Sequence, residues 1–484
     1  MRRYISTALA ALVLVLAVAC GGSGSSSTTG STSGTMSVMA TGTITGFGSI
    51  YVNGVHFQTS HAVIHKNGAA VSQSQLAVGE IARVKGVKHA DGTGDANSID
   101  VDENVVGPID SLDSTNSMLT VLGQKVKINS GTSFSADIQP QGIDGLSVGE
   151  TIRVCGTVDA SGIIVATRIA TSAPGSAMQV IGTVSNLDSS SHSFMINALN
   201  VDYSGATLND FPSGQPGNGD LVEVRGNVYV PSTTTLTATQ VERVHSEHED
   251  ADGGSEIERE GLITRFVSAT DFDVTGQPVT TNDSTTYRNG TKDDLALNVK
   301  VEVEGSYDSN NVLVASVVAF HHNGGILLQS QVTAVDATAG TLTVLGVTVN
   351  VTSMTRVEDH AMSHDEMFNL GDISVGDIVE VRGYESPAGS GVLLATRLER
   401  EPASSPAIAA GPFSVASSPT FTVFGVTVDA SSAVLKSATG ATLTYDEFVT
   451  QATGQNVAAI GTLSGTIVLA SAAWIMHPED HGDN

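Results

Sequence analysis

The feature of this sequence most suited to chemistry is the close pairing of its histidines. Thirteen histidines are present, and eight of them stand in four pairs. Neutral imidazole is a common ligand of transition metals, so closely spaced histidines are candidate metal ligands. One pair, His321 and His322, has no acidic run beside it. The candidate ligands for a divalent metal are the other three pairs, His245 and His248, His360 and His364, and His477 and His481.

The surroundings of these pairs leave two interpretations open. Acidic residues surround the first and last candidate pairs, in residues 245–252 and 477–483, and carboxylates can complete a metal site. His360 and His364 share one face if residues 358–370 form a helix, as their apolar spacing predicts. The same composition is typical of a solvated, charged loop that binds no specific metal. Neither acidic run has the ligand spacing of a calcium-binding loop.

Motifs for nucleophilic catalysis and for nucleotide binding are absent from the sequence. It has no Gly-x-Ser-x-Gly elbow, no Ser-x-x-Lys set, no His-Glu-x-x-His helix and no phosphate-binding loop ending in Lys-Ser or Lys-Thr. The 51 glycines stand at predicted hairpins and strand ends, where a positive φ is needed. We therefore predict that the protein is not an enzyme and uses no cofactor other than the divalent metal considered above.

Charge and aromatic content argue against nucleic acid as a partner. Asp and Glu number 50 against 22 Lys and Arg, for a formal net charge of −28 at pH 7. Binding to nucleic acid depends on basic side chains that neutralise phosphates and on aromatic stacking platforms. Aromatic residues make up only 5% of the chain, and Trp474 is its single tryptophan, which also leaves few aromatic faces for sugars. The expected partner is an unidentified protein or glycan.

The first twenty residues are typical of a bacterial lipoprotein signal. Arg2 and Arg3 form a positive segment, and residues 9–18 form an apolar stretch too short to persist as a membrane span. The junction at residues 17–20, Ala-Val-Ala-Cys, resembles the lipobox of bacterial lipoproteins. This resemblance implies cleavage before Cys20 and a membrane anchor of acyl chains on that residue. An ordinary secretory cleavage site is the alternative interpretation.

The residues after the lipobox indicate where the protein is held. Gly21 follows the cysteine where inner-membrane lipoproteins carry aspartate, so resemblance to Gram-negative lipoproteins implies the outer membrane or cell surface. Residues 20–40 are rich in Gly, Ser and Thr, and such segments behave as flexible tethers.

Cys155 is the only other cysteine, so acylation of Cys20 leaves it without an intramolecular disulfide partner. If the lipobox interpretation is wrong, the two cysteines could pair. On a predicted strand, Cys155 and Val154 point to opposite faces. Charged residues are rarely buried without a partner, and in other repeats the position equivalent to Cys155 holds a charged residue. Those residues are Lys85, Arg225, Glu304 and Arg382. Cys155 is therefore expected on an exposed outer face, with packing against an adjoining repeat as the alternative.

Beyond the tether, one pattern of short strands occurs six times. Each copy has an opening strand, a hairpin, a variable segment and two closing strands, and the hairpin at residues 50–57 has a favoured Asn-Gly turn. The opening strands begin at Gly42, Gly107, Gly182, Gly261, Ser330 and Gly411. The strongest signature, Gly-[Asp/Glu]-x-x-x-Val-x-Gly, ends at Gly86, Gly156, Gly226 and Gly383. Repeats four and six keep the strand but lose the opening Gly-acid pair.

This order predicts an all-β fold of six tandem OB-like small barrels of five strands each. The variable segment is predicted to be helical at residues 358–370 and 444–453. Units of this size can just bury their own cores, so contacts are expected within a repeat or between sequence neighbours. Two adjacent sheets per unit is the alternative packing.

As a set, these motifs resemble a family of tandem OB-like repeats known only as a domain of unknown function, found in bacterial lipoproteins and secreted proteins. The resemblance covers residues 41–476. No activity is established for that family, so the resemblance implies no functional residues.

The sequence thus predicts a non-enzymatic cell-envelope lipoprotein that acts as a spacer, a scaffold or a module that binds a ligand or partner. Metal binding through the histidine and acid clusters between repeats is the alternative. The predicted parts are a signal peptide (1–19), an acylated tether (20–40), repeat 1 (41–104), repeat 2 (105–174), repeat 3 (176–246), an acidic linker (247–257), repeat 4 (258–322), repeat 5 (325–402), repeat 6 (405–476) and a His/acidic tail (477–484).

Overall fold

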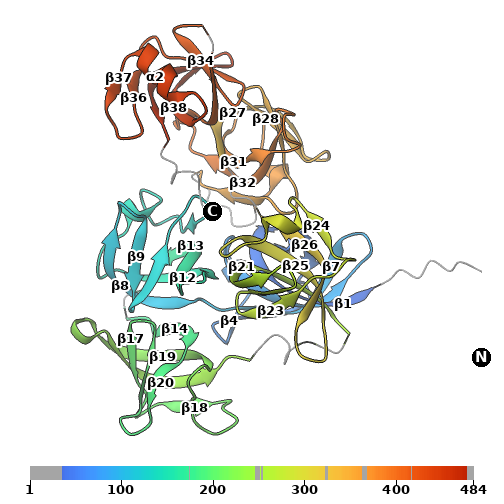
Figure 1. Ribbon diagram of the computed structural model, residues 1–484, viewed down its shortest axis with the longest axis vertical. Coiled ribbons are helices and arrows are strands. Elements are labelled where there is room, and N and C mark those ends of the chain that lie inside the picture. Colours follow the sequence, from blue (N-terminus) through green and yellow to red (C-terminus); the bar gives the residue numbers. More distant parts are fainter. Residues whose placement is uncertain are drawn as a thin grey trace, which may run out of the picture. The chain divides into compact units, whose positions relative to one another are not determined.

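Strands dominate the computed structural model, which describes residues 35–173, 175–245, 251, 254–321, 325–361, 368–415 and 417–476. Within these residues, the only helices are one α-helix, α2 (Tyr445–Ala452), and short 3-10 helices (Figure 1). The predicted all-β class is therefore confirmed. None of the described helices is long and apolar enough to cross a membrane. The expectations for the signal peptide and Cys20 lie outside the described residues.

Each of the first three repeats supplies five main strands and one or two short additional ones, and the first main strand of repeat 3 is divided into two. Repeat 1 contains β1 (Met36–Phe47), β2 (Ile50–Val52), β3 (Val55–Gln58), β6 (Ile81–Lys88) and β7 (Thr93–Val101), with β4 (Val63–Lys66), β5 (Ala69–Ala70) and η1 (Gln73–Gln75) between them. Repeat 2 contains β8 (Val105–Asp113), β9 (Met118–Val121), β10 (Gln124–Lys127), β12 (Thr151–Val158) and β13 (Ile164–Thr171), with β11 (Ser133–Phe134) and η2 (Ile143–Gly145). Repeat 3 contains β14 (Met178–Thr183), β15 (Ser185–Asp188), β16 (Ser193–Ile196), β17 (Leu199–Asp202), β19 (Leu221–Val230) and β20 (Thr235–Arg243), with β18 (Thr207–Asn209) and η3 (Pro231–Thr233).

The last three repeats follow the same order. Repeat 4 contains β21 (Glu256–Ser268), β22 (Asp271–Val274), β23 (Gln277–Thr280), β25 (Lys300–Tyr307) and β26 (Leu313–Phe320), with β24 (Thr286–Arg288) and η4 (Lys292–Asp294). Repeat 5 contains β27 (Ile326–Asp336), β28 (Thr341–Val344), β29 (Val347–Asn350), β31 (Ile378–Glu385) and β32 (Leu393–Glu401), with β30 (Arg356–Asp359) and η5 (Leu370–Asp372). Repeat 6 contains β33 (Ala407–Val415), β34 (Thr420–Val423), β35 (Val426–Asp429), β38 (Asn456–Ser464) and β39 (Ile467–Ile475), with β36 (Val434–Lys436), β37 (Thr442–Leu443) and α2.

Strand pairing within a repeat runs in a closed cycle. In repeat 5, β27 pairs with β28 and β28 with β29, β29 lies parallel to β32, and β31 pairs with both β32 and β27. The same five pairings occur in the other repeats, with the first strand of repeat 3 divided into β14 and β15. In every repeat a short strand also lies parallel to the last one, as β30 does to β32.

The glycine that ends the sequence signature is required by the backbone around it. In each repeat the register between the last two strands shifts at this position, which marks a β-bulge. A Cβ atom on Gly226 would lie 2.5 Å from the carbonyl oxygen of Thr237. A Cβ atom on Gly461 would lie 2.0 Å from that of Leu469. Repeat 6 therefore keeps this requirement although it has lost the opening Gly-acid pair.

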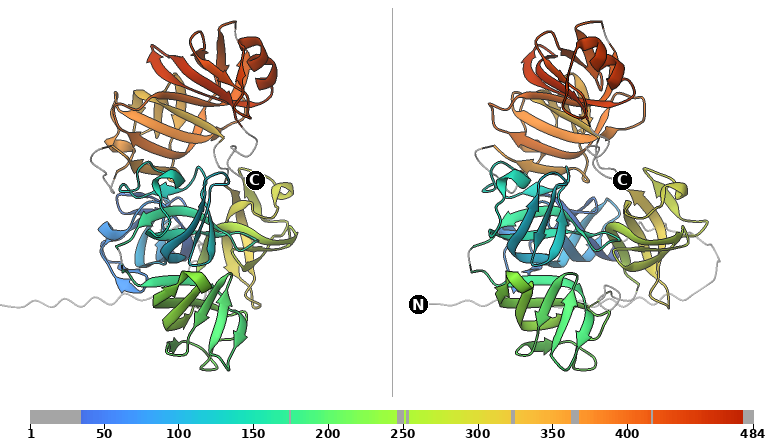
Figure 2. Two further views of the ribbon diagram at one scale, coloured as in Figure 1. Left: turned by 90° about the vertical axis from the view of Figure 1, so that its left-hand side faces the viewer. Right: turned by 60° about the vertical axis from the view of Figure 1, so that its left-hand side comes forward.

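The sheets continue from one repeat into another. β1 pairs with β21, β8 with β14 and β27 with β33, which gives three 13-stranded sheets. The cores of repeats 2 and 3 merge, as do those of repeats 5 and 6, drawn in orange and red in Figure 2. β21 begins at Glu256, two residues inside the predicted acidic linker.

The pairing of repeat 1 with repeat 4 differs from the expected restriction of contacts to sequence neighbours. Residues 38–41 of β1 pair with residues 256–259 of β21. Over this stretch β6 occupies only one edge of β1, and β2 joins β1 further along, from Ile44 onward. The open edge can therefore accept a strand from elsewhere in the chain, as unpaired edges generally do.

The two helical predictions have different outcomes. Residues 444–453 contain α2, whose N-cap Thr444 forms a capping box with Glu447 and whose buried face carries Phe448 and Ala452. Residues 358–370 begin in strand β30 and reach a 3-10 turn at Leu370, so the predicted helix is wrong at both ends. Parallel pairing with β32 holds the first residues extended. Residues 362–367, which include His364, lie outside the described residues.

The expected exposure of Cys155 is wrong. Ile152 and Val154 of β12 belong to the hydrophobic core and Cys155 does not, as the predicted alternation requires, but Cys155 is only 3% exposed. Burial raises the pKa of the thiol, and Glu80 and Glu103 of repeat 1 raise it further. Packing of the outer face against another repeat, the alternative interpretation, accounts for this burial.

Candidate functional site

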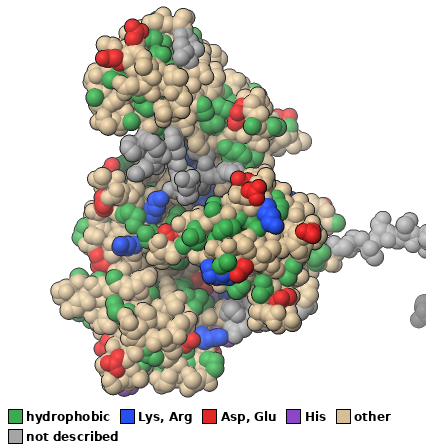
Figure 3. Space-filling model, in the orientation of Figure 1, with side chains coloured by type: hydrophobic (Ala, Val, Ile, Leu, Met, Phe, Trp, Pro, Cys, Tyr) green, Lys and Arg blue, Asp and Glu red, His purple; other side chains and the backbone are tan. Residues whose placement is uncertain are grey.

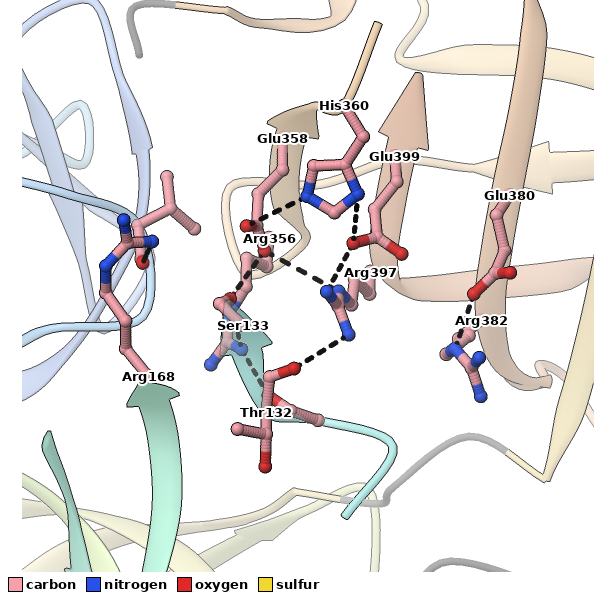
Figure 4. A network of polar contacts seen from close by, with 12 residues as sticks. Thr132, Ser133, Arg168, Arg356, Glu358, His360, Glu380, Arg382, Arg397 and Glu399 are labelled. Carbon is pink, nitrogen blue, oxygen red and sulfur yellow. Dashed lines mark hydrogen bonds and ion pairs between the residues drawn. The ribbon is translucent and has the colours of Figure 1, made fainter. Parts of the chain in front are cut away.

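Charged side chains gather on one buried face of repeat 5 (Figure 4). Side chains alternate between the faces of a strand, and the registers of β30, β32 and β31 place three arginines in one row and three glutamates in the next. The arginines are Arg356, Arg397 and Arg382, and the glutamates are Glu358, Glu399 and Glu380. Like charges directly opposite each other destabilise a sheet, so this face needs compensating contacts.

Some of the compensation comes from ion pairs within repeat 5. The Arg397 guanidinium forms an ion pair with Glu399, and its Nε lies 3.5 Å from Oε1 of Glu358. Nε of Arg382 lies 2.7 Å from Oε1 of Glu380. Arg356 and Arg397 are 8% and 9% exposed, and buried charges are strongly destabilising unless they are paired or hydrogen-bonded.

The rest of the compensation comes from repeat 2. Ser133 of β11 donates a hydrogen bond from Oγ to Oε1 of Glu358 at 2.6 Å. Nη1 of Arg356 donates to the carbonyl of Gly131, to Ser133 Oγ and to the carbonyl of Thr167. Nη1 of Arg397 donates to the carbonyls of Ser130 and Thr132, at 3.0 and 3.2 Å. We call Arg356, Glu358, Arg397 and Glu399, with these partners in repeat 2, the inter-repeat cluster.

His360 lies directly after β30, where its backbone N–H donates to the carbonyl of Arg400 at 2.8 Å and extends the strand pairing. Its ring lies between carboxylates (Figure 4). Nε2 is 3.6 Å from Glu358 Oε2, while Nδ1 is 3.3 Å from Glu399 Oε1 and 3.5 Å from Glu401 Oε1. Burial alone would lower the pKa of His360, but hydrogen bonds to Glu358 and Glu401 and the charge of Glu399 raise it to about 10.

The same neighbours also shift the pKa values of the Glu358 and Glu399 carboxyl groups. Burial opposes the ionisation of Glu358, yet Arg397 and His360 hold its pKa below the ordinary range. Burial raises the pKa of Glu399, and Arg397 only partly offsets that effect. His360 and the buried charged residues of the cluster therefore form one electrostatic network.

Glu358, His360 and Glu399 are also candidate metal ligands. One ligand atom each from Glu358, His360 and Glu399 lies within 4.8 Å of the other two, and imidazole with carboxylates suits several transition metals. A single ion can bind only one ring nitrogen of His360, however, and the two nitrogens face different carboxylates. Metal binding would also have to displace the proton from the ring.

The comparisons with known proteins identify the repeats. The family model of a domain of unknown function (DUF5666) matches residues 41–100, 106–170, 181–242, 260–319 and 331–399. The chain belongs to the DUF5666 family. Repeat 6 lies outside these matches, although its strands pair in the same cycle. No curated protein matches the chain. The expected resemblance to a tandem-repeat family of unknown function is thus confirmed, and the family model assigns no activity.

Of the six histidines predicted from the sequence of this DUF5666 protein to be metal ligands, the structure describes two. His360 contacts Glu358 and Glu399 of the inter-repeat cluster, and His245 is exposed just after β20. His248, His364, His477 and His481 lie outside the described residues, as does Cys20. The structure therefore does not bring two of these candidates together within the residues it describes.

Residues that the sequence analysis missed provide most of the cluster. Arg356, Glu358, Arg397 and Glu399 come from the fifth DUF5666 repeat, and Ser133 comes from the second. A signal was present, because charges stand at every second position in residues 356–358 and 397–401, in a chain with only 15% charged residues. Such alternation on a strand places the charges on one face.

A second polar contact joins repeats 1 and 4. Thr43 Oγ1 donates to Oε1 of Glu260 at 2.6 Å, and Lys300 Nζ lies 2.8 Å from the same oxygen. Burial would raise the pKa of Glu260, but Lys300 and His321 outweigh burial and lower it to about 2. Lys88 of repeat 1 forms a further ion pair with Glu258 of β21.

The surface in Figure 3 agrees with the low content of basic residues. On the face drawn there, Lys and Arg side chains are few and scattered, and some of them lie beside acidic side chains (Figure 3). Contacts between repeats, by contrast, use several basic side chains. Arg356 and Arg397 donate hydrogen bonds to repeat 2, and Lys88 of repeat 1 forms an ion pair with Glu258 of repeat 4.

Proposed function

We propose that this DUF5666 protein is a non-enzymatic lipoprotein of the outer membrane or cell surface, whose repeats are OB-like barrels that pack into a ligand-binding scaffold. The closed strand cycle supports the OB-like part, because its order and its parallel third and fifth strands are those of that fold. The lipobox-like residues 17–20 and Cys20 support the anchor. The formal charge of −28 supports a partner other than nucleic acid.

The observation that carries the scaffold proposal is the inter-repeat cluster. Arg356, Arg397 and Glu358 of repeat 5, all buried, form hydrogen bonds with carbonyls and a hydroxyl of repeat 2. A flexible string of independent repeats would not form these hydrogen bonds, which contribute about 1.5–3 kcal/mol each when one partner is charged. Spacing alone would not require such contacts, which favours a packed scaffold over a simple spacer.

A double-mutant cycle tests the scaffold proposal. Ser133→Ala and Glu358→Gln should each destabilise the protein, and together they should cost less than the sum by about 1–3 kcal/mol, as expected for a charged hydrogen bond. Chemical unfolding followed by the fluorescence of Trp474 measures these changes in the unit that contains repeats 5 and 6. Strictly additive effects would overturn the proposal.

The anchor has its own test in cells. Cys20→Ser should move the protein from the membrane fraction to the soluble fraction and abolish incorporation of labelled palmitate. Ser23→Cys combined with Cys20→Ser is a matched control, because it restores a thiol outside the lipobox and should not restore labelling. Persistent labelling of the Cys20→Ser protein would refute the anchor.

Metal binding is the second candidate function, favoured by the approach of Glu358, His360 and Glu399 to within 4.8 Å of one another. Titration calorimetry with Zn²⁺ should then give saturable binding that weakens about tenfold per pH unit on acidification, because the ion competes with one proton. His360→Gln should abolish binding and Glu385→Gln should leave it intact. Failure of the wild-type protein to bind Zn²⁺ at pH 8 would exclude this candidate.

A further inference from the structure

We propose that a cavity lined by repeats 1, 2, 4 and 5 binds a small molecule through a carboxylate or phosphate group, with Arg356 as the principal recognition residue. The inference rests on the proposed function as a ligand-binding scaffold and names the chemical class of its ligand. The cavity has a volume of about 540 Å³, within the range of about 300–1,000 Å³ typical of small-molecule sites.

The lining of this cavity is basic in a protein that is acidic overall. Its wall includes six Lys and Arg side chains, which are Lys88, Arg288, Lys300, Arg356, Arg382 and Arg397. Only three acidic residues line it, namely Glu260, Glu302 and Glu304. The whole chain has 22 Lys and Arg against 50 Asp and Glu, so the cavity reverses the charge balance of the protein.

Several carboxylates that pair with these basic residues lie outside the wall. Arg382 pairs with Glu380 and Arg397 with Glu399, and neither glutamate lines the cavity. The basic row of the sheet therefore borders the cavity, while Glu380, Glu399 and His360 line a separate cavity of about 420 Å³. An anion in the first cavity would meet the arginine row without facing the glutamate row.

Arg356 differs from the other arginines of the row because no carboxylate pairs with it among the residues that the structure describes. It is 8% exposed. All of its hydrogen bonds within the described part of the chain come from Nη1, to Gly131, Ser133 and Thr167. The Nε and Nη2 edge thus has no protein acceptor there, and this edge can bind two oxygens of one carboxylate or phosphate.

A neighbouring cavity of about 350 Å³ shares Arg356, Lys300 and His321 with the first one. Both cavities therefore adjoin the Arg356 guanidinium, whose Nε and Nη2 edge a bound anion would contact. A long polyanion does not fit this proposal, because the net charge of −28 would repel it outside the cavity. A compact anion is the class that the geometry favours.

Titration calorimetry of the full mature chain tests the proposal with two probes, inorganic phosphate and succinate, in 150 mM NaCl at pH 7. Saturable binding of at least one probe is expected, and the preferred probe distinguishes a phosphate ligand from a carboxylate ligand. Arg356→Gln should raise the dissociation constant at least tenfold, and Arg356→Lys should also weaken binding because lysine lacks the two-donor edge.

Two further variants separate recognition from folding and from general charge. Arg382 lines the same cavity. Arg382→Gln leaves the contacts of Arg356 with repeat 2 in place, and it should also weaken binding. Arg265→Gln removes an exposed charge that pairs with Asp271 and Asp273 outside the cavity, and it should leave binding unchanged. No saturable binding of either probe, or equal losses in Arg265→Gln and Arg356→Gln, would overturn the inference. The scaffold proposal would survive that result if the Ser133 and Glu358 variants remain coupled.

Discussion

The hydroxyl of Ser133 and the carboxylate of Glu358 form a 2.6 Å hydrogen bond although they stand 225 positions apart in the chain. Ser133 belongs to repeat 2 and Glu358 to repeat 5. Equivalent short strands carry them, since β11 lies parallel to β13 as β30 does to β32. The short strand that lies parallel to the last strand of each repeat therefore carries the contact between repeats 2 and 5.

Substitution of the bulge glycine tests why the sequence signature ends in glycine. Gly226→Ala should destabilise the protein by about 1–3 kcal/mol, because the new Cβ would overlap the carbonyl of Thr237 and force the strands apart. Gly205→Ala in the same repeat is a matched control, since a Cβ there meets no atom within 4 Å, and it should change stability by less than about 0.5 kcal/mol. Chemical unfolding followed by circular dichroism measures both. Equal effects of the two variants would show that the bulge does not require glycine.

Acidification should weaken the contact between repeats 1 and 4 through Glu260. Its pKa in the folded protein is lowered to about 2 from an ordinary value of 4.5, so its stabilising effect is complete above pH 4.5 and is lost as the pH falls toward 2. The effect is on the order of 3 kcal/mol at neutral pH. Unfolding free energies of wild type and Glu260→Gln should differ most above pH 5 and converge near pH 2. A difference that is constant across this range would contradict the assignment.

Cys155 should resist modification in the native protein. A maleimide should label the Cys20→Ser protein only after denaturation, because the thiol is buried against repeat 1 and its pKa is raised. Ser114→Cys in the exposed turn after β8 provides a control. That variant should take up one equivalent when native and two when unfolded, as measured by mass spectrometry. Rapid labelling of native Cys155 would mean that the repeats separate in solution.

Local features of the fold could be predicted from the sequence because local interactions determine them. Apolar alternation and turn glycines predicted the strands and hairpins, and the helix at residues 444–453 has its capping residue and apolar face within one short segment. The glycine signature could be recognised for the same reason. The clash that explains it, between Gly226 and Thr237, involves only adjacent strands.

Contacts between repeats could not be predicted in this way. Cys155 was assigned to the correct face of its strand, but nothing near it in the sequence shows that repeat 1 covers that face. His360 was predicted to act with His364, four residues away on a helix, and that pairing depended on a helix that does not form at residues 358–361. Its observed partners Glu358, Glu399 and Glu401 come from two strands, and the partner of Glu358 comes from another repeat.

Hydrogen exchange on the intact mature chain tests most directly whether distant repeats form one scaffold. Glu358→Ala in repeat 5 should accelerate amide exchange in residues 129–135 of repeat 2, because it removes the acceptor of Ser133 and a carboxylate that pairs with Arg397. Asp336→Ala, an acidic residue of repeat 5 that caps its own turn, should leave residues 129–135 unchanged. Faster exchange in repeat 2 for Glu358→Ala alone is the predicted result. Exchange that changes only within repeat 5 for both variants would contradict the packed scaffold.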